Sequence, residues 1–301
     1  MPLKSQLRID KLLSNVSVQY KNEEYIADEL CPVVPVDKDS DKYRIYEKNW
    51  KLPEAKRAPK GVSKEFQFNY SLAGYSLEQY ALKDYVGVDE ERNNDIGSVR
   101  ADAVENLTDA LLRIREDKVA ALYTTTSWSL NVSLAAANAF NANTTVSNPI
   151  PVFDTGAATV IANSGKTPNH GMMTHEAYIA VKNHISVLDR VKYTSSEISE
   201  NVIAALLGLP ELFIAKANKD TAADGLAASN SNFFGDVAFL GWKSPSPSMR
   251  APSCVYNFEN AAPRVKAWFD NERDAEAIEV EMKFIPKVVA SLTGYLIKDV
   301  V

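Results

Sequence analysis

The sequence has no long hydrophobic run and few cysteines, and each shortage excludes a class of protein. No apolar run approaches the roughly 18–20 residues that a membrane-spanning helix needs, so we expect no membrane partner. The N-terminal segment alternates polar and apolar residues and lacks the continuous apolar stretch of a secretion signal. The only two cysteines, Cys31 and Cys254, lie far apart in sequence, which argues against a disulfide framework and fits a reducing compartment.

Complete catalytic motifs are missing as well. Residues Ser164 to Thr167 read SGKT, the end of a phosphate-binding loop, but the full motif needs glycine at position 160, where Val160 stands. We therefore interpret SGKT as a turn between a helix and a strand. His175-Glu176 begins a zinc motif whose second histidine would fall on Ile179. The sequence thus offers no complete nucleotide or zinc motif.

The remaining reactive side chains also have ordinary interpretations. The only other histidines, His170 and His184, fit no metal-binding spacing, and surface or capping roles are expected for all three histidines. An acidic turn at residues 270–276 is interpreted as a solvated hairpin, with a divalent-ion site as the lesser alternative. We predict no catalytic, cofactor-binding or metal-binding residue, and no cofactor.

The formal net charge of −6 argues against a chain that attracts nucleic acid over its whole surface. One stretch is nevertheless basic. EKNWKLPEAKRAPKGVSKE (47–65) holds five lysines and one arginine, and it is too polar to bury much surface. Strand patterns flank it at Tyr43–Tyr46 and Phe66–Leu72, so we expect a hairpin with a long loop. That loop could contact phosphate, or equally another subunit.

Elsewhere the sequence predicts both helices and strands. Residues 95–123 have apolar side chains at helical spacing, which predicts a helix roughly 40 Å long. Residues 154–225 alternate helix and strand patterns, with Thr174 expected to cap a helix through His184. From about residue 233 strand patterns dominate, and residues 278–284 alternate apolar and charged side chains. This alternation is typical of an antiparallel sheet with one face in water.

A chain with a protruding hairpin, an extended N-terminal segment and no catalytic constellation favours contacts with copies of itself. The order of its segments resembles the HK-ninety-seven-type major capsid proteins of tailed bacteriophages. The resemblance covers nearly the whole chain and rests on order and spacing rather than on a single motif. The stretches that carry it are YIADELCPVVPVDKDSDKYRIY (25–46), TPNHGMMTHEAYIAVKNHISVLDRVKYTS (167–195), ALLGLPELFIAKA (205–217) and AEAIEVEMKFIPKVVASLTGYLIKDVV (275–301).

The resemblance implies an α+β capsid fold with an N-terminal arm, an extended β-hairpin loop, a peripheral domain with a long spine helix, and an axial α/β domain. The arm would be residues 1–42 and the extended loop 43–75. Residues 76–130 would form the peripheral domain with the spine helix, and residues 131–240 would form the axial domain. Residues 241–301 would supply peripheral strands and a last strand that returns toward the axial domain.

The resemblance also implies a function: self-assembly into hexamers and pentamers of an icosahedral shell that encloses packaged double-stranded DNA. Further expected partners are a separate scaffolding protein, a portal protein and a possible decoration protein. The protein would be part of the virion and would be assembled in the host cytoplasm. Candidate residues for contacts between subunits, on the arm and the extended loop, are Tyr25, Tyr43, Tyr46, Trp50, Lys51, Lys56, Arg57, Lys60 and Lys64.

Two alternatives and one departure from the family remain. The nearest alternative is an encapsulin, a bacterial compartment shell of the same fold; the distant one is a hydrolase or nucleotide-binding enzyme that uses SGKT or the histidines. Some relatives cross-link their shell through lysine and asparagine with the help of a glutamate. Glu276 stands where that asparagine would be, and Lys283 where the glutamate would be. We therefore expect no covalent cross-link.

Overall fold

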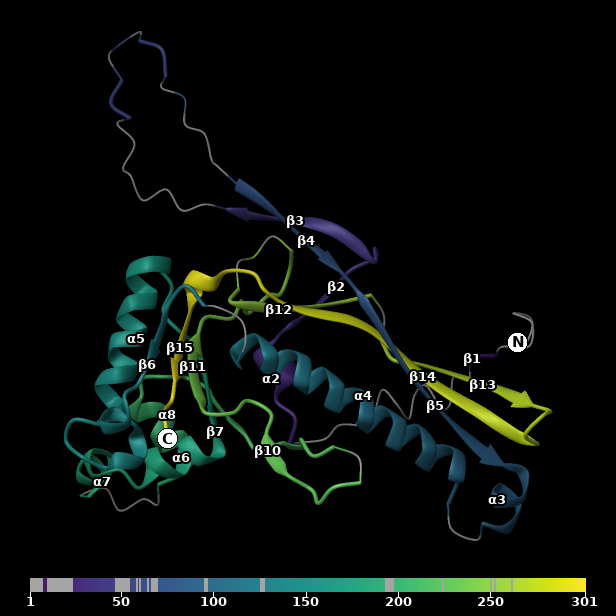
Figure 1. The fold of residues 1–301 in the computed structure, drawn as a ribbon. Coiled ribbons are helices and arrows are strands. Elements are labelled where there is room, and N and C mark those ends of the chain that lie inside the picture. The colour runs from purple at the N-terminus through teal and green to yellow at the C-terminus, as the bar shows by residue number, and fades with distance from the viewer. Residues whose placement is uncertain are drawn as a thin grey trace.

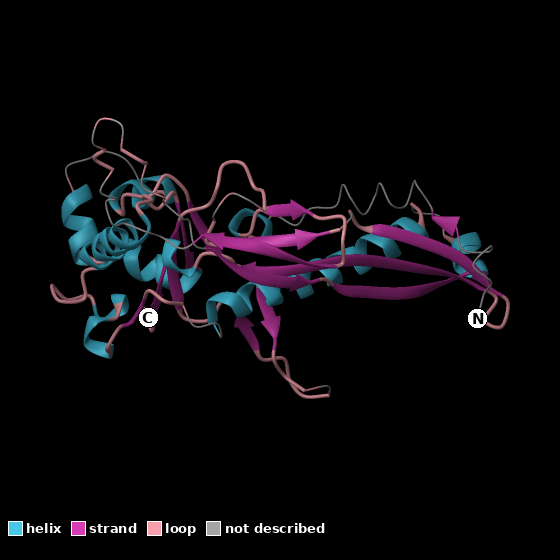
Figure 2. Cartoon of the chain, turned by 90° about the horizontal axis from the view of Figure 1, so that it is seen from above, coloured by secondary structure: helices cyan, strands magenta, loops and turns pink. Residues whose placement is uncertain are grey.

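The computed structural model describes most of the chain and shows an elongated molecule (Figures 1 and 2). A sheet with most of the helices lies at one end, and a second, longer sheet extends away from it alongside the helix α4. The described residues are 8–9, 24–46, 55–57, 59, 61–63, 65, 70–94, 97–124, 128–192, 198–223, 225–249, 251, 253–260 and 262–301.

The longer sheet has six strands in the order β1-β13-β14-β12-β2, and β5 pairs with the other side of β14. All of its pairs are antiparallel except β2 with β12. The central strand β14 pairs with β5 along ten residues, so these two strands form the spine of the sheet. The strands are β1 (Arg8–Ile9), β2 (Val33–Pro35), β5 (Glu78–Gly87), β12 (Val255–Glu259), β13 (Arg264–Asp270) and β14 (Ala275–Val288).

The long helix α4 (Val99–Thr124) covers one face of this sheet, and the short helix α3 (Val88–Asn93) lies beyond the end of β5. Apolar residues of α4 recur every three to four positions, so one side of the helix packs on the sheet. Val104 and Leu111 meet Ile278, Val280 and Phe284 of β14 in one buried cluster. The helix predicted at 95–123 is confirmed, with its described start at Val99.

The second sheet has five strands in the order β6-β15-β11-β7-β8. Every residue of β7 and β11 is buried, because apolar clusters lie on both faces. On β11, Phe239 belongs to one cluster and Leu240 to the other. The strands at HGMMT and LFIA fit the alternation of helix and strand patterns predicted over residues 154–225, and the strand at GYLIK fits the strand patterns predicted from about residue 233. The strands are β6 (Asn131–Ser133), β7 (His170–Thr174), β8 (Leu212–Ala215), β11 (Val237–Gly241) and β15 (Gly294–Lys298).

Helices pack against this second sheet. The Thr174 hydroxyl accepts a hydrogen bond from the backbone N–H of Ala177, as a helix cap does, so its predicted role is confirmed. The expected single helix through His184 is two helices, because α6 ends at Lys182 and His184 caps α7. The helical elements are α5 (Pro149–Ser164), α6 (His175–Lys182), α7 (Ile185–Val191), α8 (Glu200–Leu206), η2 (Ala136–Asn138), η3 (Phe140–Ala142) and η4 (Ser291–Thr293).

A two-stranded stem projects from the body (Figure 1). It consists of β3 (Ser40–Tyr46) paired antiparallel with β4 (Tyr70–Ser76), which confirms the predicted hairpin strands in these ranges. The first part of the predicted second strand, 66–69, lies outside the described residues. A smaller antiparallel pair is β9 (Asn218–Asp220) with β10 (Asn230–Asn232).

The apolar cluster that contains Phe239 joins the two sheets. The one-turn helix α2 (Ala27–Leu30) lies against α4, and its buried side chains meet Tyr123 of α4 and Phe239 of β11. The cluster also contains both cysteines, Cys31 and Cys254, each fully buried and free. Cys31 therefore packs in the core.

Candidate subunit-contact surfaces

The base of the N-terminal segment, residues 25–31, is attached to α4 by polar contacts. The Tyr25 hydroxyl donates to Asp109 Oδ1 at 3.1 Å. Arg113 pairs with the same carboxylate at 2.6 Å and also reaches the Tyr25 hydroxyl oxygen at 3.5 Å. Tyr25 is therefore already engaged within its own chain, and its role between subunits stays a prediction.

A buried carboxylate forms the centre of this attachment. Glu116 is fully buried, and its two oxygens accept the backbone N–H groups of Ile26 at 3.3 Å and Ala27 at 2.9 Å. These donors open α2, so Glu116 acts as a cap supplied from another helix. Burial raises the pKa of Glu116 to about 7, although the two hydrogen bonds oppose that shift.

Arg115 connects the same segment to the longer sheet. Its guanidinium lies 2.5 Å from Asp28 and 3.5 Å from Glu259 of β12. With the Asn257 side-chain amide turned so that its oxygen faces Arg115, that oxygen also accepts a hydrogen bond from the Arg115 guanidinium, at 2.7 Å. Burial raises the pKa of Glu259, and Arg115 opposes that shift. One arginine thus connects α2, α4 and β12.

The stem uses one of its faces within the chain and leaves the other exposed. Tyr43 is 5% exposed, and its ring lies 5.5 Å from that of Phe258; the ring of Tyr75 stacks on Phe258 at 4.7 Å. Leu72 on the opposite face is 57% exposed. Tyr43, a candidate contact residue, is thus a core residue of its own chain, and its proposed role between subunits is not tested by this packing.

The other candidates lie on or beyond the stem. Lys56 and Arg57 are exposed. Arg57 donates to the Gly61 carbonyl and, at 3.4 Å, to the Ser63 hydroxyl. Of Tyr46 only the backbone, in β3, is described. Trp50, Lys51, Lys60 and Lys64 lie outside the described residues.

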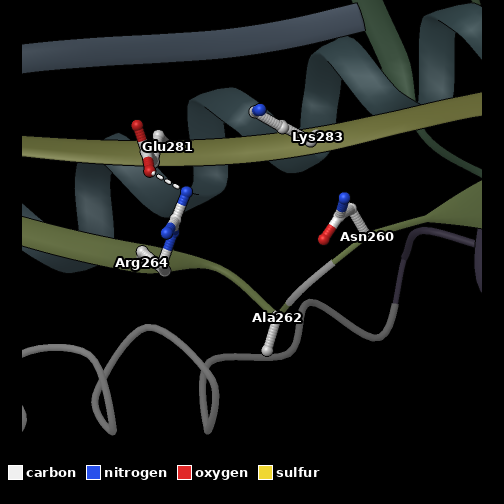
Figure 3. A pocket seen from close by; sticks show the side chains of 5 residues that line it. All are labelled: Asn260, Ala262, Arg264, Glu281 and Lys283. Carbon is white, nitrogen blue, oxygen red and sulfur yellow. Dashed lines mark ion pairs between the residues drawn. The ribbon is translucent and has the colours of Figure 1, made fainter. Parts of the chain in front are cut away.

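The outer face of the longer sheet departs from expectation. Glu281 was expected on a wet face, yet it is 2% exposed. Its carboxylate lies 2.6 Å from Arg264 and 2.5 Å from Lys266, and it accepts from Gln79 at 2.9 Å. The surrounding side chains cover Glu281, so this face holds a salt-bridge cluster that is buried at its centre and meets water at its edges, where Arg264 is 45% exposed. A cavity of about 50 Å³ lies beside it, lined by Asn260, Ala262, Arg264, Glu281 and Lys283 (Figure 3).

The remaining motifs have structural roles. Gly165 of SGKT ends α5 with φ 61°, and Lys166 and Thr167 are exposed, so the predicted helix-to-strand turn is confirmed. A phosphate loop would instead open a helix. His184 caps α7 as predicted, but His170 is fully buried, so the expected surface or capping role is wrong for it. Burial lowers the pKa of His170 to about 3.

Within the described ranges, no group of three or more His, Cys, Asp or Glu side chains could hold a metal ion. In the same part of the chain, no helix is long and apolar enough to cross a membrane. The acidic residues near Asp274 form the tight turn between β13 and β14, with φ 48° at Asp274, as the predicted hairpin requires.

Comparison with known proteins connects this geometry to a family. No protein-family model matches the chain. It is 27% identical over 200 residues to the major capsid protein of Burkholderia phage BcepMu, and the match spans 64% of each protein, less than two thirds of that relative. It is 24% identical over 228 residues to the major capsid protein of Pseudomonas phage JBD67, which spans 72% of this chain and 71% of the relative.

Solved structures extend the match to the whole fold. A phage-related protein from Bordetella bronchiseptica superposes with a TM-score of 0.79 at 26% identity, covering 97% of both chains. The capsid of cyanophage P-SCSP1u gives 0.62 at 13% identity, covering 93% of this chain and 89% of the other. This chain is similar in sequence to the two phage major capsid proteins and has the HK-ninety-seven-type fold. An encapsulin from Synechococcus elongatus gives 0.57 at 11% identity, over 93% and 88% of the two chains, so the capsid fold is shared with compartment shells.

Within this capsid fold, the two positions expected to replace the cross-linking residues are in ion pairs of their own. Lys283 lies 3.1 Å from Asp39, and Glu276 pairs with Arg100 of α4. The expectation that no covalent cross-link forms stays a prediction.

The sequence analysis did not predict the buried charges of α4 that attach residues 25–31, the arm base, to the body of the protein. A signal was present, because Leu111, Arg115 and Val119 lie four residues apart on the predicted helix. An arginine in an apolar stripe predicts a buried ion pair. For Glu116, which lies beside that stripe, the spacing gives no such signal.

Proposed function

We propose that the protein is the major capsid protein of a tailed bacteriophage, which assembles into hexamers and pentamers of an icosahedral shell around double-stranded DNA. The observation that carries the proposal is the sequence similarity to two phage proteins that are both named major capsid protein. The fold supports it, because the likeness to solved capsid proteins spans nearly the whole chain.

The surface of the stem is consistent with assembly. Leu72 is 57% exposed, and Val62, in the described part of the loop beyond the stem, is 93% exposed. On a projecting hairpin, apolar side chains that the described residues leave uncovered offer contact area to a neighbouring subunit. In a closed shell many such modest contacts add up, so no single contact has to be strong.

The division of the chain follows from the same proposal. Residues 1–42 form the arm and 43–75 the extended loop, each of which contacts a neighbouring subunit. Residues 76–130 with 241–301 form the peripheral domain, and 131–240 the axial domain near the capsomer centre. Lys56 and Arg57 are the described loop residues proposed for such contacts.

Partners beyond the shell itself are part of the proposal. A separate scaffolding protein, a portal protein and a possible decoration protein take part in assembly in the host cytoplasm, and the protein ends in the virion. DNA is enclosed without sequence-specific binding. The net charge of −6 supports weak contact with phosphates, which eases packaging and release.

An encapsulin is the second candidate, favoured by the encapsulin of similar fold. The two candidates differ in the contents of the particle. A phage shell packages DNA through a portal, whereas a compartment shell encloses a protein cargo.

Negative-stain electron microscopy with sedimentation of the purified chain tests the proposal. Closed shells, or rings of five and six subunits, are expected, with a scaffolding protein co-expressed if the chain alone stays unassembled. A chain that remains monomeric under both conditions contradicts a shell function. Shells that copurify with an enzyme cargo instead of packaging DNA favour the encapsulin.

Matched variants test the role of the stem. Leu72→Asp places a charge on the exposed face of the stem and is expected to abolish assembly. Leu226→Asp places the same charge on a side chain that is 72% exposed but lies outside the stem, between β9 and β10, and is expected to assemble. Equal assembly by both variants contradicts the contact assigned to the stem.

A further inference from the structure

The seat of the arm base on α4 has an unusual chemistry for a contact between two segments of one chain. The residues that cover it are apolar: Ile26, Ala27, Leu30 and Cys31 are all buried. The group at its centre is the Glu116 carboxyl. Burying a carboxylate costs free energy unless it is paired or protonated.

The free-energy cost of burying the Glu116 carboxylate is only partly offset by its contacts. Its oxygens accept two backbone N–H groups, at 3.3 and 2.9 Å, but no described cation forms a salt bridge with it. The adjacent Arg115 guanidinium is instead 2.5 Å from Asp28 and 3.5 Å from Glu259. Ionised Glu116 is therefore stabilised mainly by the two backbone hydrogen bonds, with a weaker attraction to Arg115, at a largely buried position.

The groups that face Glu116 come from three elements. From the arm base, Asp28 disfavours its negative charge and Cys31 adds an uncharged thiol. From α4, Arg115 favours the charge and Tyr123 contributes a buried hydroxyl. From β12, Glu259 competes for Arg115. The balance of these groups and the burial keeps the pKa of Glu116 at about 7.

The arm base contributes both hydrogen-bond donors at Glu116 and part of its surroundings. The donors belong to Ile26 and Ala27, whose side chains are themselves buried, so lifting this segment removes both donors and gives water access to the carboxyl group. In water a glutamate has an ordinary affinity for protons. The seated and lifted states therefore bind protons differently at this one group.

We propose that seating of residues 25–31 on α4 takes up a proton at Glu116, which makes the base of the N-terminal arm a proton-sensitive latch. By linkage, the state that binds the proton more tightly gains population as the pH falls. The arm base is thus held more firmly in mild acid and released more readily above neutral pH. Tyr25 with Asp109 and Asp28 with Arg115 hold the segment at either pH and set its position.

Hydrogen exchange of the intact, unassembled chain tests the latch. The protection of the Ala27 amide, corrected for the intrinsic pH dependence of exchange, is expected to rise roughly tenfold from pH 8 to pH 6. Glu116→Gln keeps a hydrogen-bond acceptor but cannot ionise, so the protection of the Ala27 amide in this variant should hardly change with pH. Asp109→Asn is the matched control: it weakens the Tyr25 contact and should keep the wild-type slope.

Two outcomes overturn the latch: wild-type protection that is level or falls as the pH drops, or a Glu116→Gln variant with the wild-type slope. If Glu116→Gln does not fold, the wild-type profile alone decides. Because the measurement uses chains that sedimentation shows to be unassembled, its failure would leave the shell function untouched, and a failure of shell assembly would leave the latch untouched.

Discussion

The two sheets are stabilised in different ways. In the five-stranded sheet, β7 and β11 are buried on both faces by neutral side chains such as Met172 and Phe239. In the six-stranded sheet, one face of β14 packs on α4 and the other carries charges, and Glu281 is still only 2% exposed. The first sheet depends on apolar packing, and the second also depends on ion pairs within a partly buried face.

The difference shows that an alternating strand does not require a wet face. Glu281 can be buried because Arg264 and Lys266 extend over it from β13. Buried pairs of this kind add little net stability, but removing one partner is costly. The two sheets should therefore respond differently to substitution.

The largest effect is expected in the five-stranded sheet. Phe239 is fully buried, and its ring lies 4.8 Å from that of Trp128 and 4.9 Å from that of Tyr123. Phe239→Ala should lower the free energy of unfolding by about 3–5 kcal/mol, because it removes these contacts and leaves a cavity. Chemical denaturation measures this loss.

Phe269→Ala is the control, because Phe269 on β13 is 51% exposed. Its cost should stay below about 1 kcal/mol. Equal costs for the two variants would mean that the five-stranded sheet does not depend on its apolar packing as described.

A smaller loss is expected from the charged face of the other sheet. Glu281→Leu should cost about 2–3 kcal/mol, since it leaves Lys266 and Arg264 without their shared partner. The double variant Glu281→Leu with Arg264→Met should recover part of that loss, because Lys266 keeps its pair with Glu279 whereas Arg264 has no other ion pair among the described residues. Thermal and chemical denaturation compare the two.

Glu279→Gln provides the matched control on the same strand. Glu279 is more exposed than Glu281 and pairs only with Lys266 among the described contacts, at 3.0 Å. Its replacement should change the unfolding free energy by about 0.5 kcal/mol or less. A cost for Glu281→Leu no larger than that would contradict the buried cluster.

Sequence patterns predicted the elements of both sheets better than their environments. The strand at 278–284 and the helix at 95–123 follow from periodicities of two and of about 3.6 residues, which depend only on backbone geometry. The burial of Glu281 depends on Arg264 and Lys266, which approach through the pairing of β13 with β14. Periodicity along one strand contains no information about that pairing.

The candidate contact residues show the same limit. Tyr43 is a candidate because the resemblance places it on the extended loop, and it packs on Phe258, more than two hundred residues away in sequence. The family resemblance gave the order of the segments, and the structure shows which described faces are already covered within the chain. Among the described candidates, Lys56 and Arg57 are exposed, and Leu72 is an exposed neighbour on the stem.

The two regions should also respond to pH with opposite signs. His170 in the five-stranded sheet has a pKa of about 3, well below that of an exposed histidine, because burial disfavours its charged form. Below about pH 6.5, His170 therefore binds a proton in the unfolded chain but not in the folded chain, and the free energy of unfolding falls as the pH drops. This term should cost about 2 kcal/mol between pH 7.5 and pH 5.

Glu116 contributes in the other direction. Its pKa of about 7 lies above that of an exposed glutamate, so its contribution is fully present in acid and is lost as the pH rises toward and through 7. Denaturation between pH 5 and pH 8 should show a steeper loss of stability at high pH in His170→Gln, and a steeper loss at low pH in Glu116→Gln. Identical profiles for the two variants would contradict the opposite signs.

The smallest effect on stability is expected on the stem, where the two faces of one strand differ. Leu72 is 57% exposed, whereas Tyr75 is 3% exposed and stacks on Phe258 at 4.7 Å. Leu72→Ser should change the unfolding free energy by less than about 0.5 kcal/mol, because the side chain loses almost no contact within its own chain. Tyr75→Ser should cost several times more, since it removes a buried ring. If Leu72→Ser instead destabilised the isolated chain as much as Tyr75→Ser, the exposed face of the stem would have a partner within the subunit, and a neighbouring copy would not be needed to cover it.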